Sequence, residues 1–118
     1  MDFWKLQGAG NDFILIDNRK GLIKNLSSMA RTVCHRNFGV GADGLIAVEA
    51  SGISDIRMAF FNSDGSMATM CGNGIRCFSK FVRDQGILTS DSFSVETGDG
   101  NKRGYRNDKD YQGFVFSV

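Results

Sequence analysis

Residues 60–78 have the sequence FFNSDGSMATMCGNGIRCF, in which an apolar run, a polar turn and a helical pattern follow one another. Ile75, Phe78 and Val82 recur at i, i+3 and i+7, which predicts a helix with one buried face. Gly86 is expected to end this helix in the left-handed conformation. The rest of the chain therefore has an apolar helix to pack against.

A cysteine stands directly before this helix. Asn73 is expected to cap the helix, because its side chain can accept a hydrogen bond from a free backbone N–H group. Gly72 and Gly74 would let a ligand approach the backbone closely. The free N–H groups and the helix dipole favour an anion such as a carboxylate, and they are expected to lower the pKa of Cys71. The residues thus predict a reactive thiolate beside a carboxylate site.

The structural alternative is that Cys71 is a small core residue and that residues 72–74 are only a turn. A turn needs one glycine or asparagine, whereas three such residues occur here beside a thiol, so we favour the functional interpretation. No metal site is expected, since Cys71 and Cys77 lack the spacing and the companion ligands of a zinc site.

The composition is that of a globular protein. The 118 residues have the length of one domain, with 42% hydrophobic and 23% charged residues. The net charge of +1, with acids and bases interspersed, provides no basic face for nucleic acid. No apolar run approaches membrane-spanning length, and the N-terminal MDFWKLQ lacks the apolar core of a secretion signal. Three cysteines, an odd number, indicate free thiols, so a cytoplasmic location without a membrane partner is expected.

Two strands are expected near the N-terminus. Phe3–Gln7 forms the first, and the continuous apolar run of residues 13–16 indicates a second strand that is covered on both faces. Residues 8–11 between them are expected to form a tight turn. Asn11 stays a candidate ligand-binding residue, because its amide offers a donor and an acceptor at a strand end.

The next segment has the apolar spacing of an amphipathic helix, at Leu26, Met29, Ala30, Val33 and Cys34. Asn25 or Ser27 is expected to cap it. Cys34 is expected in the core and His35 at the surface, because neighbouring residues in a helix point about 100° apart and do not face each other.

The segment FGVGADG, residues 38–44, matches the Gly-x-Gly-x-x-Gly fingerprint of dinucleotide-binding proteins. That fingerprint follows a strand and opens a helix, whereas here a helix precedes and an apolar strand at residues 45–48 follows. A glycine-rich bend is therefore the expected structure.

The strand at residues 56–62 alternates with period two, which places Asn62 on its apolar side. A polar amide there either caps a turn or meets a ligand, and its closeness in sequence to Cys71 supports the second possibility. A short strand at 93–95 and a polar hairpin tip or loop at 98–110 are expected next. The strand-like run at 113–118 suggests a part of a longer protein.

Three blocks of the sequence together resemble one known family. LQGAGNDFILID, RNFGVGADGLI and MAFFNSDGSMATMCGNGIRCFSKFV are similar, in this order, to the N-terminal half of diaminopimelate epimerase. The resemblance extends to about residue 100. Proline racemases and phenazine-biosynthesis isomerases resemble these blocks less.

The resemblance implies an amino-acid epimerase that interconverts LL- and meso-diaminopimelate, for lysine and peptidoglycan synthesis, without pyridoxal phosphate or another cofactor. Two cysteines act on opposite faces of the α-carbon, one as thiolate base and one as thiol acid. Cys71 resembles the first of them. Gly72 and Asn73 resemble the pair that holds the substrate, and Asn11 and Asn62 match substrate-binding asparagines.

The family's second catalytic cysteine belongs to a second half that is outside this chain. Residues 1–118 are therefore expected to be the N-terminal domain of a two-domain epimerase, inactive or severely impaired alone. The expected fold is α+β, an antiparallel barrel-like sheet around the helix at about 74–85, as one of two such domains. Apolar surface facing the missing C-terminal domain is expected to favour self-association, such as a homodimer.

Two other functions are weighed against the epimerase half. One is a binding module or pseudoenzyme that keeps the amino-acid carboxylate pocket without catalysis. The other is a Cys/His hydrolase, which is the weakest of the three because the one histidine, His35, adjoins Cys34 rather than Cys71.

Overall fold

The computed structural model describes residues 3–8, 10–68, 72–90, 92–98, 100–105 and 115–117. The strands in these ranges are β1 (Phe3–Gly8), β2 (Asn11–Asp17), β3 (Gly44–Glu49), β4 (Ile56–Asn62), β5 (Ser92–Thr97), β6 (Gly100–Tyr105) and β7 (Val115–Ser117). The helices are α1 (Leu26–Val33) and α2 (Gly72–Asp84). The predicted α+β class is confirmed.

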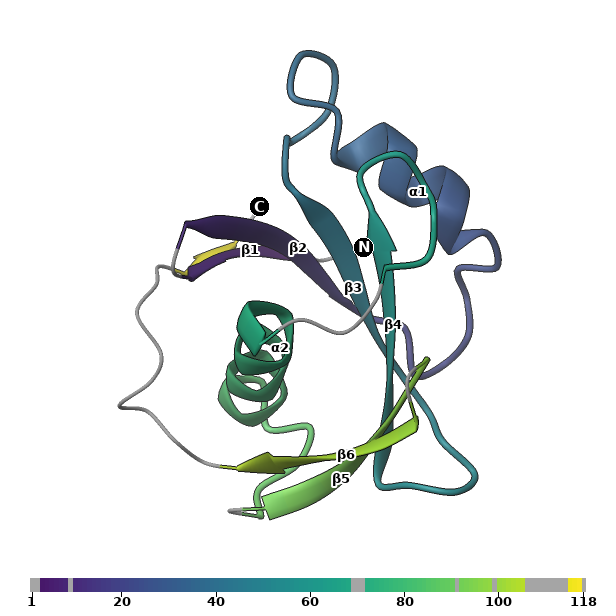
Figure 1. Ribbon diagram of the computed structural model, residues 1–118, viewed down its shortest axis with the longest axis vertical. Helices are drawn as coiled ribbons and strands as arrows, with labels where there is room; N and C mark the ends of the chain where they lie inside the picture. Colours follow the sequence, from purple (N-terminus) through teal and green to yellow (C-terminus); the bar gives the residue numbers. More distant parts are fainter. Residues whose placement is uncertain are drawn as a thin grey trace.

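The strands form one sheet with the order β6-β5-β4-β3-β2-β1-β7. β2 and β3 are parallel, as are β4 and β5, while the other neighbours are antiparallel. The prediction of an antiparallel sheet is therefore wrong, because α1 and α2 each cross a face of the sheet and return the chain in the same direction. In Figure 1 the sheet bends around α2. Its closure into a barrel and the number of domains stay predictions.

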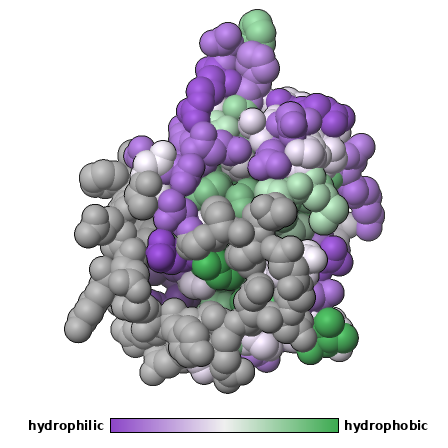
Figure 2. Space-filling model, viewed as in Figure 1, coloured by the Kyte–Doolittle hydropathy of each residue, from purple (hydrophilic) through white to green (hydrophobic). Residues whose placement is uncertain are grey.

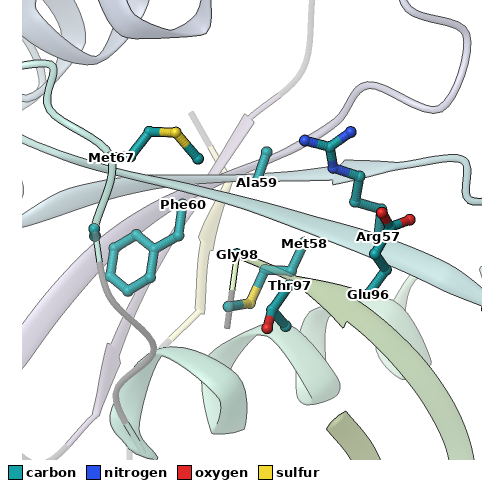
Figure 3. A pocket seen from close by; sticks show the side chains of 9 residues that line it. Arg57, Met58, Ala59, Phe60, Met67, Glu96, Thr97 and Gly98 are labelled. Carbon is teal, nitrogen blue, oxygen red and sulfur yellow. The ribbon is translucent and has the colours of Figure 1, made fainter. Parts of the chain in front are cut away.

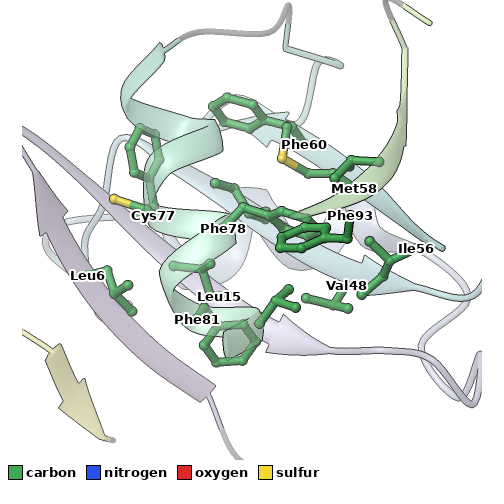
Figure 4. Packing of buried hydrophobic residues seen from close by; sticks show 14 residues of the cluster. Leu6, Leu15, Val48, Ile56, Met58, Phe60, Cys77, Phe78, Phe81 and Phe93 are labelled. Carbon is green, nitrogen blue, oxygen red and sulfur yellow. The ribbon is translucent and has the colours of Figure 1, made fainter. Parts of the chain in front are cut away.

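Helix α2 lies on the concave side of the sheet and buries its apolar face there (Figures 1 and 4). Cys77, Phe78, Phe81 and Val82 belong to one buried cluster with side chains from β1 to β5. Trp4 of β1 packs edge-on against Phe81, with 5.1 Å between the ring centroids. The predicted buried face of this helix is confirmed.

Helix α1 covers the opposite face of the sheet. In β2, Phe13 and Leu15 belong to the cluster around α2, whereas Ile14 and Ile16 pack with α1. This double coverage explains why the apolar run of β2 does not alternate. The side chain of Asn25 caps α1 by accepting a hydrogen bond from the backbone N–H of Ser28 at 2.9 Å, so the cap is not Ser27.

The two ends of α2 differ from each other in how well they were predicted. Asn73 as the N-cap is wrong, because the helix begins at Gly72 and the side chain of Asn73 bonds elsewhere. The stop at Gly86 is confirmed, with a φ of 70°. Gly86 donates its N–H to Arg83 O at 3.0 Å and Ile87 donates to Val82 O at 2.9 Å, which satisfies the last carbonyls of the helix.

The polar segment after β5 is more regular than expected. Residues 100–105 form strand β6, paired antiparallel with β5, and residues 106–110 lie outside the described part. Backbone pairing needs no apolar side chains, so the composition alone did not indicate this strand. Within the run at 113–118, β7 pairs with β1. Neither α1 nor α2 is long and apolar enough to cross a membrane.

Candidate functional site

The start of α2 contacts the first hairpin of the sheet through two amides. Gly8 pairs with Asn11 across a tight turn, as predicted, and Gly10 in that turn has a φ of 92°. Asn73 Nδ2 donates to Asn11 Oδ1 at 2.9 Å. The fold thus brings together two of the predicted site residues that are 62 positions apart.

Four charged side chains, Lys5, Asp12, Arg36 and Asp43, are linked by ion pairs beside Asn11, and we call them the charged cluster; of the four, Asp43 binds the Asn11 side chain. Asn11 Nδ2 donates to Asp43 Oδ2 at 3.3 Å, and the backbone N–H of Asp12 donates to the same oxygen at 3.0 Å. Arg36 Nη2 bridges the two carboxylates, at 3.0 Å from Asp12 Oδ1 and 3.1 Å from Asp43 Oδ1. The cluster ties the β1–β2 hairpin to the bend before β3.

The carboxyl of Asp12 is held in its ionised form. Burial raises its pKa, but hydrogen bonds from Arg36, from Lys5 and from the backbone of Asp43 outweigh burial. The result is a pKa lowered from 3.8 to about 2. The hairpin end next to Asn11 therefore carries a stable negative charge that the basic side chains neutralise.

Asn62 is exposed, and its amide is used within the turn that follows β4. Asn62 Nδ2 donates to Ser66 Oγ at 3.0 Å, and the backbone N–H of Asn62 donates to Ser66 O at 2.8 Å. Of the two alternatives for this residue, turn capping is present in the structure. Contact with a ligand stays a prediction.

Cys71 lies outside the described residues, directly before Gly72, the first residue of α2. The other two cysteines, Cys34 and Cys77, are 2% and 1% exposed and belong to apolar clusters. Burial raises the pKa of the Cys34 thiol to about 11. Cys34 is thus a core residue, as predicted, and is unsuited to serve as a thiolate base at neutral pH.

The segment between α1 and β3 is a bend, as predicted for the glycine-rich run. His35 in it is exposed, and its Nδ1 accepts from the backbone N–H of Asn37 at 3.1 Å. Gly44 at its end has no room for a side chain, because an added Cβ would lie 2.8 Å from the ring of Phe60 and 2.8 Å from the carbonyl oxygen of Phe61. Gly44 therefore offers no side-chain contact to a ligand.

The pairing of β4 with β5 ends at Arg57 and Glu96, and a small hollow opens between the two strands beyond this point (Figure 3). Met58, Phe60 and Met67 contribute its apolar lining. Its volume of about 60 Å³ has room for only a few water molecules. This hollow is therefore too small for an amino acid.

On the face in Figure 2, hydrophobic residues of the described part lie in small patches among hydrophilic ones. Among the side chains that the structure describes, the large hydrophobic ones that are exposed come from separate loops: Leu22, Phe38, Ile53 and Met67. Scattered residues of this kind are ordinary on protein surfaces.

Sequence reasoning missed the residues that hold Asn11 and Asn73. Asp43 and Arg36 bond in the charged cluster, and Arg76 Nη1 donates to Asn73 Oδ1 at 2.9 Å. The only signal was that Asp12 and Asp43 each adjoin a glycine-containing bend. The parallel register of β2 and β3, which pairs Phe13 with Gly44, brings these bends together.

Solved structures share this fold. A phenazine biosynthesis protein of the PhzF family from Bacillus anthracis has a TM-score of 0.71 at 22% identity, over 98% of this chain and 39% of its own. Methylitaconate-delta-isomerase has a TM-score of 0.68 at 12% identity, over 95% of this chain and 36% of its own. At these identities the likeness shows the fold alone, and it places the chain in the fold class of the PhzF-family proteins.

The sequence defines the family more closely. The family model for diaminopimelate epimerase matches residues 3–111. The diaminopimelate epimerase of Alkaliphilus metalliredigens is 52% identical over 101 residues, which are 85% of this chain and 36% of the relative. That of Clostridium perfringens is 51% identical over 105 residues, 87% of this chain and 38% of the relative. The chain belongs to the diaminopimelate epimerase family, matches the N-terminal part of these relatives and spans little more than a third of their length.

Proposed function

We propose that this chain carries one half of the active site of a cofactor-independent epimerase that interconverts LL- and meso-diaminopimelate. Cys71 is the proposed catalytic thiol of this half. Asn11, Asn62, Gly72 and Asn73 are the proposed substrate-binding residues. The names of the relatives support the family's reaction, and the two-cysteine mechanism and the half-site are our own proposal.

The hydrogen bond between Asn73 and Asn11 supports this proposal most directly. It joins two of the proposed substrate ligands from distant parts of the chain, next to the first turn of α2. The positive end of a helix dipole favours a carboxylate at the helix start. An amino-acid substrate could therefore be held by its carboxylate near the residue that precedes Gly72, which is Cys71.

The proposed chemistry is a proton exchange at the α-carbon. The Cys71 thiolate removes the α-proton from one face, and the resulting negative charge spreads into the substrate carboxylate, where backbone N–H groups stabilise it. A second thiol, from a C-terminal domain outside residues 1–118, gives a proton to the other face. Because one thiol cannot serve both faces, this chain alone is expected to be inactive or severely impaired.

The cellular setting belongs to the same proposal. The relatives' name implies lysine biosynthesis, and a precursor pathway of this kind fits a cytoplasmic enzyme with free thiols. The proposed partners are the diaminopimelate substrate, a C-terminal domain outside residues 1–118 and a second copy in a homodimer.

The second candidate is a binding module of the same fold that holds an amino acid without turning it over. The hydrogen bond of the Asn62 side chain to Ser66 favours it, because an amide used in a turn is less available to position a substrate for proton transfer. Both candidates share the carboxylate site and differ in whether Cys71 moves a proton.

Exchange of the α-proton of diaminopimelate with deuterated solvent tests the proposal. NMR would follow the exchange with the chain alone and with the chain mixed with the remaining part of a full-length family member. Cys71→Ala is the test variant, and Cys77→Ala, a buried cysteine of the same helix, is the matched control. We expect exchange in the mixture, lost with Cys71→Ala and retained with Cys77→Ala.

The other outcomes separate the candidates. Substrate binding without exchange in the mixture would favour the binding module. Exchange that persists in Cys71→Ala would remove this residue from the mechanism.

A further inference from the structure

Four side chains form a continuous line of hydrogen bonds that reaches beyond the proposed substrate ligands. Arg76 Nη1 donates to Asn73 Oδ1 at 2.9 Å, Asn73 Nδ2 donates to Asn11 Oδ1 at 2.9 Å, and Asn11 Nδ2 donates to Asp43 Oδ2 at 3.3 Å. We call this line the amide relay. Its two middle members are proposed substrate ligands, whereas its two ends have no part in the proposed function.

The ends of the amide relay determine its direction. An arginine side chain has only donors and an ionised aspartate has only acceptors, whereas an asparagine amide can turn over and exchange its oxygen with its nitrogen. Because Asp43 can only accept, Asn11 presents Nδ2 to it and Oδ1 to Asn73. Because Arg76 can only donate, Asn73 presents Oδ1 to it and Nδ2 to Asn11.

We propose that Asp43 and Arg76 are positioning residues that fix the amides of Asn11 and Asn73 in one orientation for the substrate. This inference rests on the proposed function. Each amide nitrogen carries two N–H groups, and the relay uses one of them. The fixed orientation therefore decides where each amide presents its remaining donor and where it presents its oxygen, which matters for a substrate that carries both carboxylate and ammonium groups.

The charged cluster holds the Asp43 end of the relay in place. Arg36 Nη2 binds one oxygen of Asp43, and the backbone N–H of Asp12 binds the other, which also accepts from Asn11. Hydrogen bonds to an ionised partner are stronger than neutral ones, and neighbouring bonds in a chain polarise one another. An aspartate whose carboxylate is fixed at both oxygens can orient an amide that a freely rotating side chain could not.

The test records the side-chain amide signals of Asn11 and Asn73 in ¹H–¹⁵N spectra of the ligand-free chain. Asp43→Asn keeps the shape of the residue but replaces an acceptor with an amide that also donates. We expect the signals of both asparagines to shift, including that of Asn73, which is linked to Asp43 only through Asn11.

The matched control is Asp12→Asn, which removes a carboxylate from the same charged cluster without removing a member of the relay. It should shift the Asn73 side-chain signal far less than Asp43→Asn does, because the backbone N–H of Asp12 that binds Asp43 stays in place. A shift at Asn11 with none at Asn73 in Asp43→Asn, or equal shifts of Asn73 in both variants, would overturn the proposal.

A second pair of variants tests the other end and decides the question if Asp43→Asn does not fold. Arg76 and Arg31 are both exposed helical arginines that donate to a side chain one turn earlier, Arg31 to Ser27 Oγ at 3.3 Å. Arg76→Met is expected to shift both amide signals, and Arg31→Met neither. Unchanged signals in Arg76→Met would contradict the relay.

The mixture with the remaining part of a family member adds a functional readout. Asp43→Asn is expected to raise KM for diaminopimelate roughly tenfold, the cost of one misdirected hydrogen bond. The amide signals are recorded without substrate, so the two proposals can fail separately. If the wild type exchanges the α-proton but Asp43→Asn does not shift the Asn73 amide signal, this inference is overturned and the proposed function still stands. If Asp43→Asn shifts the Asn73 amide signal but the wild-type mixture exchanges no α-proton, the relay is supported and the proposed function is contradicted.

Discussion

At the level of single residues, two of the three cysteines have buried thiols. Cys34 and Cys77 are buried on opposite sides of the sheet, in the clusters of α1 and α2 respectively. A buried thiol is neither accessible to a reagent nor easily ionised. The helix-start position of Cys71 predicts the opposite behaviour for that residue.

Alkylation with iodoacetamide should therefore modify one thiol in the native chain and all three cysteines in the denatured chain. Intact-mass spectrometry counts the modified thiols, and peptide mapping identifies them. The variant Cys71→Ala is expected to remain unmodified in the native state. Modification of native Cys34 or Cys77 as fast as that of Cys71 would refute the prediction.

Asp12 should make the free energy of unfolding depend on pH in the acidic range. Its pKa is lowered in the folded chain, so its contribution is complete above the ordinary value of 3.8 and is lost as the pH falls toward about 2. The side chain of its partner Arg36 is 58% exposed, which screens the interaction and limits the contribution to about 1 kcal/mol.

Urea unfolding over this pH window would measure the effect. The unfolding free energy of the wild type should decline more steeply on acidification than that of Asp12→Asn, which lacks the titrating carboxyl. Parallel pH profiles for the two proteins would show that the carboxyl contributes nothing.

At the level of secondary structure, two glycines are required for different physical reasons. Gly44 begins β3 where the chain of β4 approaches too closely for a Cβ atom. Gly86 ends α2 with a φ of 70°, although nothing lies within 4 Å of an added Cβ. The first position is limited by space and the second by backbone conformation.

Gly44→Ala should destabilise the chain by about 1–3 kcal/mol through overpacking, and Gly86→Ala by about 1–2 kcal/mol through the left-handed conformation. Gly52→Ala is the control, because Gly52 has open space around it and no positive φ. Thermal unfolding measures all three, and Gly52→Ala should be neutral or slightly stabilising. Equal losses in all three variants would refute both explanations.

For the whole molecule, one sheet supports apolar clusters on both of its faces. Phe78 is fully buried in the cluster around α2, and strand β2 contributes to both clusters. Loss of the packing around α2 should therefore unfold the α1 side as well, as a single cooperative transition.

Phe78→Ala is expected to cost about 3–5 kcal/mol, a large part of the stability of a small domain. Phe38→Ala, at a residue that is 89% exposed, is the matched control and should cost little. Unfolding in urea can be followed by fluorescence of Trp4, the one tryptophan, which packs on Phe81, and by circular dichroism. Two separate transitions would contradict the single cooperative unit.

Sequence alone determined the elements whose signals are local. Spacing identified the buried face of α2 and the apolar stripe of α1, and the left-handed preference of glycine identified the end of α2 at Gly86. Motif likeness identified the family. It also selected Asn11 and Asn73 as candidate site residues. These features depend on residues close in sequence or on blocks of sequence that the family shares.

Only the tertiary structure decided which distant groups meet. The parallel pairing of β2 with β3 brings Asp43 to Asn11, and the packing of α2 in the curved sheet brings Asn73 to the same amide. No spacing rule contains these contacts, because each depends on how crossover connections fold back over the sheet. The α+β class and the candidate residues were therefore predictable, whereas the mixed strand order and the amide relay followed from packing over long sequence separations.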